Sequence, residues 1–188
     1  IGWSDVPLCT AFQAVVNVNK KSEINETFDM ILDSTLTNYY AWRVPKNGNI
    51  FIGLATEQES RSGKDALTRL AARFGYRTFH AIHGSSFRRP FLDHHLAAGQ
   101  GRILFVGESA GFISPFSGEG ISYALASAQA ATEVLYDRPE GTADDYAEKI
   151  RPLKKNIIER GEMARSFYGS RQKRKLYDLS NGLKEREL

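Results

Sequence analysis

A glycine-rich stretch at residues 101–120, GRILFVGESAGFISPFSGEG, most constrains what this chain can fold into. Residues 102–106 within it predict a short buried strand, and the alanine-rich residues 120–135 predict a helix. Between them glycine allows positive φ and lets a ligand approach the main chain closely. The glycines that matter here are Gly107, Gly111, Gly118 and Gly120. The stretch therefore predicts a strand, a tight turn and a helix N-terminus, whose unpaired N–H groups suit an anionic ligand.

The same stretch contains GESAG at residues 107–111, which matches the G-x-S-x-G pattern of serine esterases. In that class a carboxylate and a histidine base follow the serine along the chain. No histidine lies after His95 in this sequence, so no base follows Ser109. Pro115 also keeps the backbone irregular where an esterase leads directly into its helix. We therefore disfavour an esterase and interpret Ser109 as a small residue beside a ligand.

The residues before this stretch predict an antiparallel sheet and one helix. Asn47-Gly48 is a strong hairpin signal between segments 38–44 and 49–55. Two further segments, 12–19 and 27–33, have strand composition. A helix ending at Gly75 is predicted because apolar residues recur before it at helical spacing, namely Leu67, Leu70, Ala71 and Phe74.

The residues after the stretch predict further helices. Residues 144–168 predict an amphipathic helix with a kink or break at Pro152, and the polar tail after Ser170 predicts a final helix. The chain as a whole therefore predicts an α+β fold, with an antiparallel sheet, a strand–turn–helix segment and C-terminal helices.

Composition and charge narrow the classes of partner. With one cysteine, Cys9, no internal disulfide forms, and without a signal peptide we expect a cytoplasmic protein. Ten Lys or Arg residues lie between positions 149 and 175, against Glu159 and Glu162. Such a segment is typical of a solvated helix face, and it also suits peripheral contact with an anionic membrane. Without an aromatic platform or zinc spacing beside it, we expect no nucleic-acid partner.

The four histidines lie within residues 77–100, at His80, His83, His94 and His95. Their spacing matches no familiar zinc pattern, so we expect no metal site.

The stretch RILFVGESAGFISPFSGEGISYALASAQAATEVL, residues 102–135, resembles the second flavin-binding motif of glutathione-reductase-like FAD-dependent oxidoreductases. Among these it looks most like the geranylgeranyl reductase family, with its Gly-Asp-Ala-Ala-Gly … Pro-x-x-Gly-Glu-Gly-Ile pattern. The resemblance implies that Glu108, which replaces the usual Asp, binds the ribityl chain and that the turn from Pro115 to Ile121 lies against the flavin ring. The implied FAD contacts are Gly107, Glu108, Ser109, Gly111, Phe112, Pro115, Ser117, Gly118, Glu119, Gly120 and Ile121.

The hairpin YYAWRVPKNGNIFIGLA, residues 39–55, resembles the Pro-x-x-Tyr-x-Trp-x-Phe-Pro segment of the same family. That segment lines the substrate cavity beside the flavin, which implies substrate contacts by Tyr40, Trp42 and Pro45. Thr37 and Val44 stand where the family has Pro and Phe.

The resemblance runs from Phe12 to the C-terminal tail but includes no G-x-G-x-x-G unit for the ADP half of FAD. It therefore implies the C-terminal part of a larger flavoprotein, with a substrate-domain portion at 1–100, an FAD-binding segment at 101–140 and a helical region at 141–188.

The implied activity is reduction of C=C bonds in the prenyl group of a lipid or pigment precursor, with NAD(P)H or ferredoxin as electron donor. Two alternatives stay open: an FAD-dependent monooxygenase or halogenase, and a non-catalytic remnant. This fragment alone is expected to be inactive.

Overall fold

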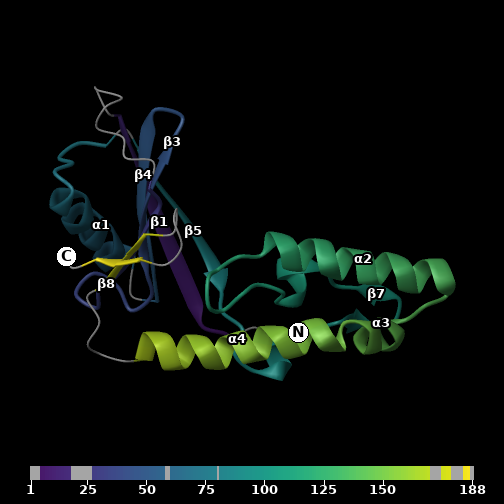
Figure 1. Ribbon diagram of the computed structural model, residues 1–188. Helices are drawn as coiled ribbons and strands as arrows, with labels where there is room; N and C mark the ends of the chain where they lie inside the picture. The colour runs from purple at the N-terminus through teal and green to yellow at the C-terminus, as the bar shows by residue number, and fades with distance from the viewer. Residues whose placement is uncertain are drawn as a thin grey trace. The chain divides into compact units, whose positions relative to one another are not determined.

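The computed structural model describes residues 5–17, 27–57, 60–79, 81–169, 175–178 and 184–186, which form two compact units (Figure 1). The sheet unit comprises Cys9–Phe87 with Ser170–Leu188, and the helical unit comprises Ile1–Leu8 with Arg88–Gly169. The predicted domain boundaries at residues 100 and 140 stay a prediction, because a compact unit need not be a functional domain.

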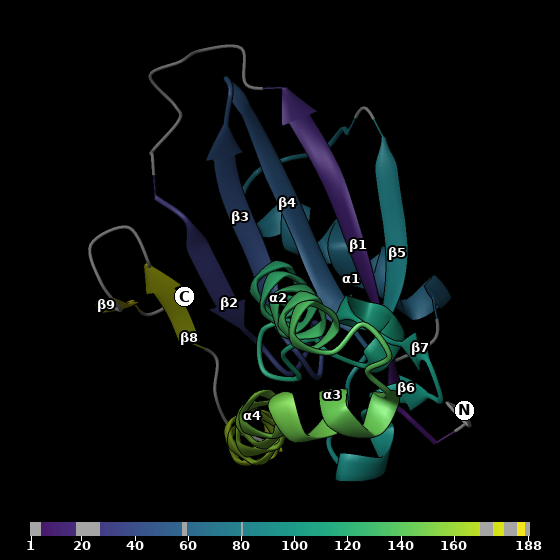
Figure 2. The ribbon, with the colours of Figure 1, turned by 90° about the vertical axis from the view of Figure 1, so that its right-hand side faces the viewer.

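The sheet unit is built on a seven-stranded sheet in the order β5-β1-β4-β3-β2-β8-β9. Figure 2 shows β5, β1, β4, β3 and β2 side by side. The strands are β1 (Leu8–Asn17), β2 (Asp29–Leu32), β3 (Ala41–Lys46), β4 (Asn49–Thr56), β5 (Ile82–Arg88), β8 (Lys175–Asp178) and β9 (Lys184–Arg186). The antiparallel pairing of β1, β4, β3 and β2 confirms the predicted α+β class with an antiparallel sheet.

The β3–β4 hairpin forms where the sequence predicts it. Asn47 and Gly48 have φ of 52° and 75°, and Lys46 pairs with Asn49. Positive φ at both central residues is what a type I′ turn requires, and that turn matches the twist of the strands it joins.

One face of the sheet packs on α1 (Ser60–Arg73). Alternate residues of a strand point to the same face, so β1 and β4 contribute every second residue to this core. Leu67, Leu70 and Ala71 of α1 are fully buried against them, as their helical spacing predicts. The strand residues in this cluster are Phe12, Ala14, Val16, Ile31, Ala41, Ile50, Ile52 and Leu54.

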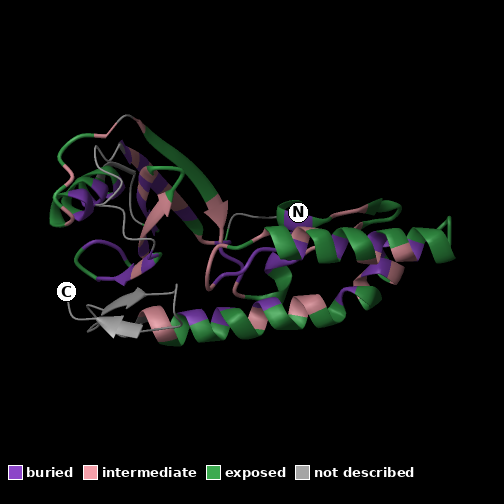
Figure 3. Ribbon diagram, turned by 45° about the horizontal axis from the view of Figure 1, so that its top comes forward, coloured by how far each residue is buried: buried purple, intermediate pink, exposed green. Residues whose placement is uncertain are grey.

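The helical unit places three helices around a second core. The helices are α2 (Ile121–Asp137), α3 (Ala143–Lys149) and α4 (Arg151–Gly169), and Figure 3 shows buried positions recurring along α2 and α4. Short 3₁₀ turns occur at η2 (Asp93–His95) and η3 (Gly107–Ala110). Phe112, Tyr146 and Ile157 of this core are fully buried. Among the described helices, none combines the length and apolarity needed to cross a membrane.

The predicted helix over 144–168 is interrupted, as Pro152 indicates. The chain forms α3 and α4 with Ile150 between them, and Pro152 is the second residue of α4. Proline is tolerated there because the N–H groups of a first helical turn have no intrahelical acceptor.

Two predictions about elements are wrong. Residues 102–106 do not form a buried strand: β7 covers only Ile103–Leu104, it pairs with the two residues of β6 (Gly99–Gln100), and Ile103 is 65% exposed. In the described part of the chain no larger sheet covers this apolar segment. For the tail after Ser170 the sequence predicts a helix, but the tail contains the strands β8 and β9. The pairing of β8 with β2 outweighs the local propensity for a helix.

Candidate functional site

The glycine-rich stretch forms a short strand, a 3₁₀ turn, an irregular loop and then α2. Gly107 begins η3 with φ of 57°, and Gly111 ends it with φ of 80°. Both values lie in the left-handed region that favours glycine. The loop from Phe112 to Gly120 then leads into α2, which begins at Ile121.

Gly107 lies directly against α2. A β-carbon at this position would come within 3.1 Å of the Ala124 Cβ. The Gly107 N–H donates to the Ser127 Oγ at 2.9 Å, and the Ser127 side chain is fully buried. Contact with the helix therefore fixes the start of η3.

Glu108 and Ser109 lie on the exposed side of η3. The Ser109 Oγ donates to the Val106 carbonyl at 2.7 Å, so the hydroxyl closes its own turn. In the described part of the chain no hydrogen bond joins Ser109 to a histidine, whereas His94 pairs with Asp5. This arrangement lacks the serine–histidine contact that an esterase needs.

The loop before α2 is closed by its own hydrogen bonds. The Ser114 N–H donates to the Glu119 carbonyl and the Gly118 N–H donates to the Ser114 carbonyl, both at 2.8 Å. The Ser117 N–H donates to the Ser114 Oγ at 3.2 Å. Within this segment Phe112 and Pro115 are buried, whereas Glu119 and Ile121 are exposed. The loop is thus a defined structure that presents its later residues at the surface.

The N-terminus of α2 is capped by Glu119. Its carboxylate accepts the Ser122 N–H at 2.7 Å and the Ser122 hydroxyl at 2.6 Å. Hydrogen bonding from the Ser122 side chain is the main cause that lowers the pKa of the Glu119 carboxyl. The charge that this helix end favours is therefore supplied in part by the chain itself.

Tyr40 and Trp42 lie on the face of the sheet opposite α1. Their ring centroids are 5.7 Å apart, and the Trp42 Nε1–H donates to the Gln13 Oε1 at 3.1 Å. Pro45 is three residues from Trp42, so the alternation of a strand places it on the other face. The structure thus brings together two of the three predicted substrate residues. Gln13 was missed, although a lone polar residue in the apolar run AFQAVV is a signal that favours it.

Thr37 fixes the segment that leads to Tyr40. It is buried, its hydroxyl donates to the Ala55 carbonyl of β4, and its Oγ1 accepts the Tyr39 N–H at 3.0 Å. The Thr37 hydroxyl, as donor to one backbone group and acceptor from another, thus holds this segment in place.

Substituting Gly53 is expected to displace Trp42. A β-carbon at Gly53 would lie 2.4 Å from the indole and 2.7 Å from the Phe12 carbonyl oxygen, and backbone gives way less easily than a side chain. We expect Gly53→Ala to lower the free energy of unfolding of the sheet unit by about 1–3 kcal/mol, the usual cost of overpacking. Urea denaturation followed by circular dichroism measures this.

The matched control is Gly84→Ala in β5, where the nearest atom to the added carbon is 3.4 Å away. Equal urea midpoints for the two variants would show that Gly53 is not needed to seat the indole.

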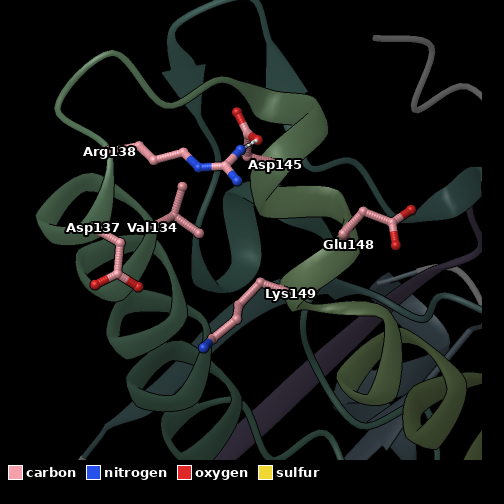
Figure 4. Close-up of a pocket in the computed structure, with 6 residues that line it drawn as sticks. All are labelled: Val134, Asp137, Arg138, Asp145, Glu148 and Lys149. Carbon is pink, nitrogen blue, oxygen red and sulfur yellow. Dashed lines mark hydrogen bonds and ion pairs between the residues drawn. The ribbon is translucent and has the colours of Figure 1, made fainter.

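A surface hollow lies in the helical unit, away from the glycine-rich loop (Figure 4). Its lining residues come from α2, α3 and the segment between them: Val134, Asp137, Arg138, Asp145, Glu148 and Lys149. Arg138 and Asp145 form an ion pair at 2.7 Å, and Asp145 also accepts the Thr142 N–H at the start of α3. Lys149 pairs with Glu133 at 2.7 Å. These charges stabilise the helix ends, and none of the predicted site residues lines the hollow.

Asp5, His94 and His95 cluster in the helical unit, with candidate ligand atoms within 4.8 Å of one another. The His95 Nδ1 accepts the Phe91 N–H at 3.1 Å, so neutral His95 carries its proton on Nε2, which faces Asp5 at 3.4 Å. A nitrogen that carries a proton offers no lone pair to a metal, so the cluster suits hydrogen bonding. His83 lies on exposed β5, and His80 lies outside the described residues.

Several basic residues of α4 are paired. The Lys154 Nζ lies 3.1 Å from Asp93 and the Lys155 Nζ lies 3.8 Å from Glu159. The side chains of the basic residues after position 169 lie outside the described part of the chain.

Known proteins resemble this chain, some in sequence and some in fold. No protein-family model matches the chain. It is 29% identical over 134 residues to Protein CbrA from Escherichia coli O6:H1, which covers 70% of this chain and 37% of that protein. Against Protein CbrA from strain K12 it is 29% identical over 138 residues, covering 70% and 38%. The chain therefore spans less than half the length of these relatives.

Solved structures resemble the chain as well, among them a reductase-like protein and a halogenase. A geranylgeranyl bacteriochlorophyll reductase-like protein from Thermoplasma acidophilum matches with a TM-score of 0.66 at 16% identity, over 90% of this chain and 44% of that one. A tryptophan 6-halogenase from Streptomyces toxytricini matches with a TM-score of 0.55 at 14% identity, over 89% and 32%. The chain thus shares the α+β fold of these two structures over about 90% of its length.

Proposed function

We propose that this chain is the flavin-contacting part of an FAD-dependent oxidoreductase that reduces C=C bonds of prenyl groups. The observation that carries the proposal is the seating of η3 on α2. At Gly107 a β-carbon would crowd Ala124 at 3.1 Å, and Glu108 and Ser109 stay exposed on the other side of the turn.

The residues present fit a flavin. An exposed carboxylate such as Glu108 accepts hydrogen bonds from the hydroxyls of a ribityl chain. The loop from Pro115 to Ile121 offers backbone to border a ring system, and hydrogen bonds within the loop hold its conformation. FAD, when bound, supplies the hydride chemistry, whereas these residues bind and orient it.

The open face of the sheet supports an apolar substrate. Around Tyr40 and Trp42 it carries further half-buried apolar side chains, Val15, Val44 and Phe51. Such a face suits an extended hydrocarbon chain, because burying apolar surface drives binding. We propose a prenylated lipid or pigment precursor as substrate and NAD(P)H or ferredoxin as electron donor.

Further polypeptide is expected to cover part of the helical unit. Ile121, Leu125 and Tyr136 recur along one side of α2 and are 77%, 68% and 86% exposed. The apolar β7 residue Ile103 is exposed as well. Exposed apolar residues on one helix side are typical of an interface. Because the matched relatives are more than twice as long as the matched region, we propose that another part of the full-length protein packs here.

The absorption spectrum of the full-length gene product tests the flavin. Flavin bands in that protein support the proposal, and their absence even after FAD is added rejects it.

The likeness to a halogenase makes halogenation or hydroxylation the second candidate function. Alkene reduction without oxygen supports the reductase, whereas substrate-dependent oxygen uptake supports the second candidate.

We also propose contact with an anionic membrane surface through α4. Lys155 is exposed, and a basic residue near such a surface contributes about 1 kcal/mol. We expect Lys155→Glu to weaken binding to phosphatidylserine vesicles about fivefold or more in a flotation assay. Lys64→Glu makes the same charge change at an exposed position of α1 and serves as control. Equal binding by the two variants would reject membrane contact through this helix.

A further inference from the structure

Arg89 is a buried charged residue that contacts the glycine-rich loop from outside it. Only 4% of its surface is exposed. Its guanidinium donates from Nε and from Nη2 to one acceptor, the Pro115 carbonyl, at 3.0 and 2.8 Å. The guanidinium also lies 4.9 Å from the centre of the Phe91 ring.

Tyr168, in the last turn of α4, contacts the next carbonyl of the same loop. Its hydroxyl donates to the Phe116 carbonyl at 2.9 Å. The Arg89 guanidinium lies 5.7 Å from the centre of the Tyr168 ring, and the Phe116 ring lies 5.5 Å from it. Two residues distant in sequence thus hold two consecutive carbonyls of the loop.

The two contacts set the direction of the loop's peptide groups. A trans peptide points its C=O and the following N–H in opposite directions. With the Pro115 carbonyl held by Arg89, the Phe116 N–H is directed to the other side of the loop. With the Phe116 carbonyl held by Tyr168, the Ser117 N–H is directed toward the Ser114 Oγ, 3.2 Å away.

Arg89 and Tyr168 each donate to a backbone carbonyl of the loop, so together they fix the direction of its peptide groups. Resting on the proposed function above, we propose that Arg89 and Tyr168 are positioning residues for the flavin. They fix the Pro115 and Phe116 carbonyls so that the loop presents the Phe116 N–H to the cofactor in one direction.

The test is Tyr168→Phe in the full-length gene product, with Tyr146→Phe as control. Tyr146 is fully buried, and its hydroxyl also donates to a backbone carbonyl, that of Ser127, at 3.2 Å. Both variants lose one tyrosine–carbonyl hydrogen bond in the same unit, but only Tyr168→Phe loses one to the loop. The readouts are the FAD dissociation constant, the flavin reduction potential, and amide hydrogen exchange over residues 114–118 without FAD.

We expect Tyr168→Phe to raise the dissociation constant about threefold to tenfold, as the loss of one hydrogen bond does, to shift the potential and to speed amide exchange in the loop. Tyr146→Phe is expected to change thermal stability alone. Arg89→Lys keeps the charge but not the paired donors, and its dissociation constant and potential should change in the same direction.

Equal FAD affinity, potential and exchange in the Tyr168→Phe and Tyr146→Phe variants would overturn the inference while leaving the flavin proposal intact. Failure of the unaltered protein to bind FAD would instead reject the proposed function, and loop exchange without FAD would still report whether Tyr168 holds the loop.

Discussion

Gly107→Val is expected to weaken FAD binding by the full-length protein at least tenfold. A side chain at φ of 57° strains the backbone, and its β-carbon would lie 3.1 Å from the Ala124 Cβ, so η3 must move away from α2. That movement is expected to weaken the buried hydrogen bond from the Gly107 N–H to Ser127. Crowding costs about 1–3 kcal/mol, and an unpaired buried donor costs about 1–3 kcal/mol more. FAD binding that needs η3 seated on α2 must repay this cost, and 1.4 kcal/mol is a factor of ten in affinity, so we expect a loss of at least tenfold.

Gly101→Val separates crowding from backbone strain. Gly101 has φ of 56°, almost the same as Gly107, but no atom lies within 4 Å of its added carbon. Both variants bear the strain of a left-handed residue, and only Gly107→Val pushes on α2. FAD titration by fluorescence quenching, with thermal denaturation alongside, measures both effects. If the two variants lose affinity equally, the contact between η3 and α2 is not what the cofactor needs.

Features that depend on neighbouring residues in the chain could be predicted from the sequence. The Asn47-Gly48 hairpin follows from positive φ at both central residues, and the buried side of α1 follows from its helical spacing. The break near Pro152 follows from its missing N–H group. Each of these depends on chemistry within a few residues, which a single sequence contains.

Features that depend on partners distant in the chain could not be predicted from the sequence. Residues 102–106 have the composition of a strand that is buried on both faces. Ile103 is nevertheless exposed. Burial depends on which other strands lie beside the segment, and composition does not reveal them. In the tail after Ser170, β8 pairs with β2, about 145 residues earlier. Local polarity predicts a helix there and does not reveal this distant partner.

The candidate site divides in the same way. Gly107 and Glu108 could be predicted as site residues because they follow one another in a recognisable pattern. Arg89 and Tyr168 lie before and well after that pattern, and only the fold brings them to the loop. Pro45 was grouped with Trp42 by the motif, and the alternation of β3 separates the two.

Asp33→Asn is expected to destabilise the sheet unit by about 2–3 kcal/mol. Asp33 is buried, and its carboxylate accepts hydrogen bonds from Arg73 and, at 2.7 Å each, from the N–H and hydroxyl of Thr35. Breaking a fully buried ion pair costs about 3–5 kcal/mol, and the expected value is lower because the Arg73 side chain is 39% exposed. Urea denaturation at neutral pH measures the change, and Asp65→Asn, at an exposed position of α1, is the control.

The same carboxylate predicts a pH dependence. Burial alone raises the pKa of Asp33, but hydrogen bonds from Arg73 and Thr35 outweigh burial, so the pKa lies below its usual value of 3.8. A carboxyl with a lowered pKa in the folded state stabilises it fully above the unfolded pKa, and this stabilisation is lost as the pH falls through the folded pKa. The gap in unfolding free energy between the unaltered protein and Asp33→Asn should therefore be constant from about pH 7 to pH 5 and narrow below about pH 4.

The Asp33 main-chain carbonyl also accepts the Thr37 N–H, and the Thr37 hydroxyl accepts the Tyr39 N–H. Acid should thus loosen the segment leading to Tyr40 in the unaltered protein, seen as a lower protection of the Tyr39 amide relative to its intrinsic exchange rate. A gap that stays constant down to pH 3 would contradict this account of Asp33.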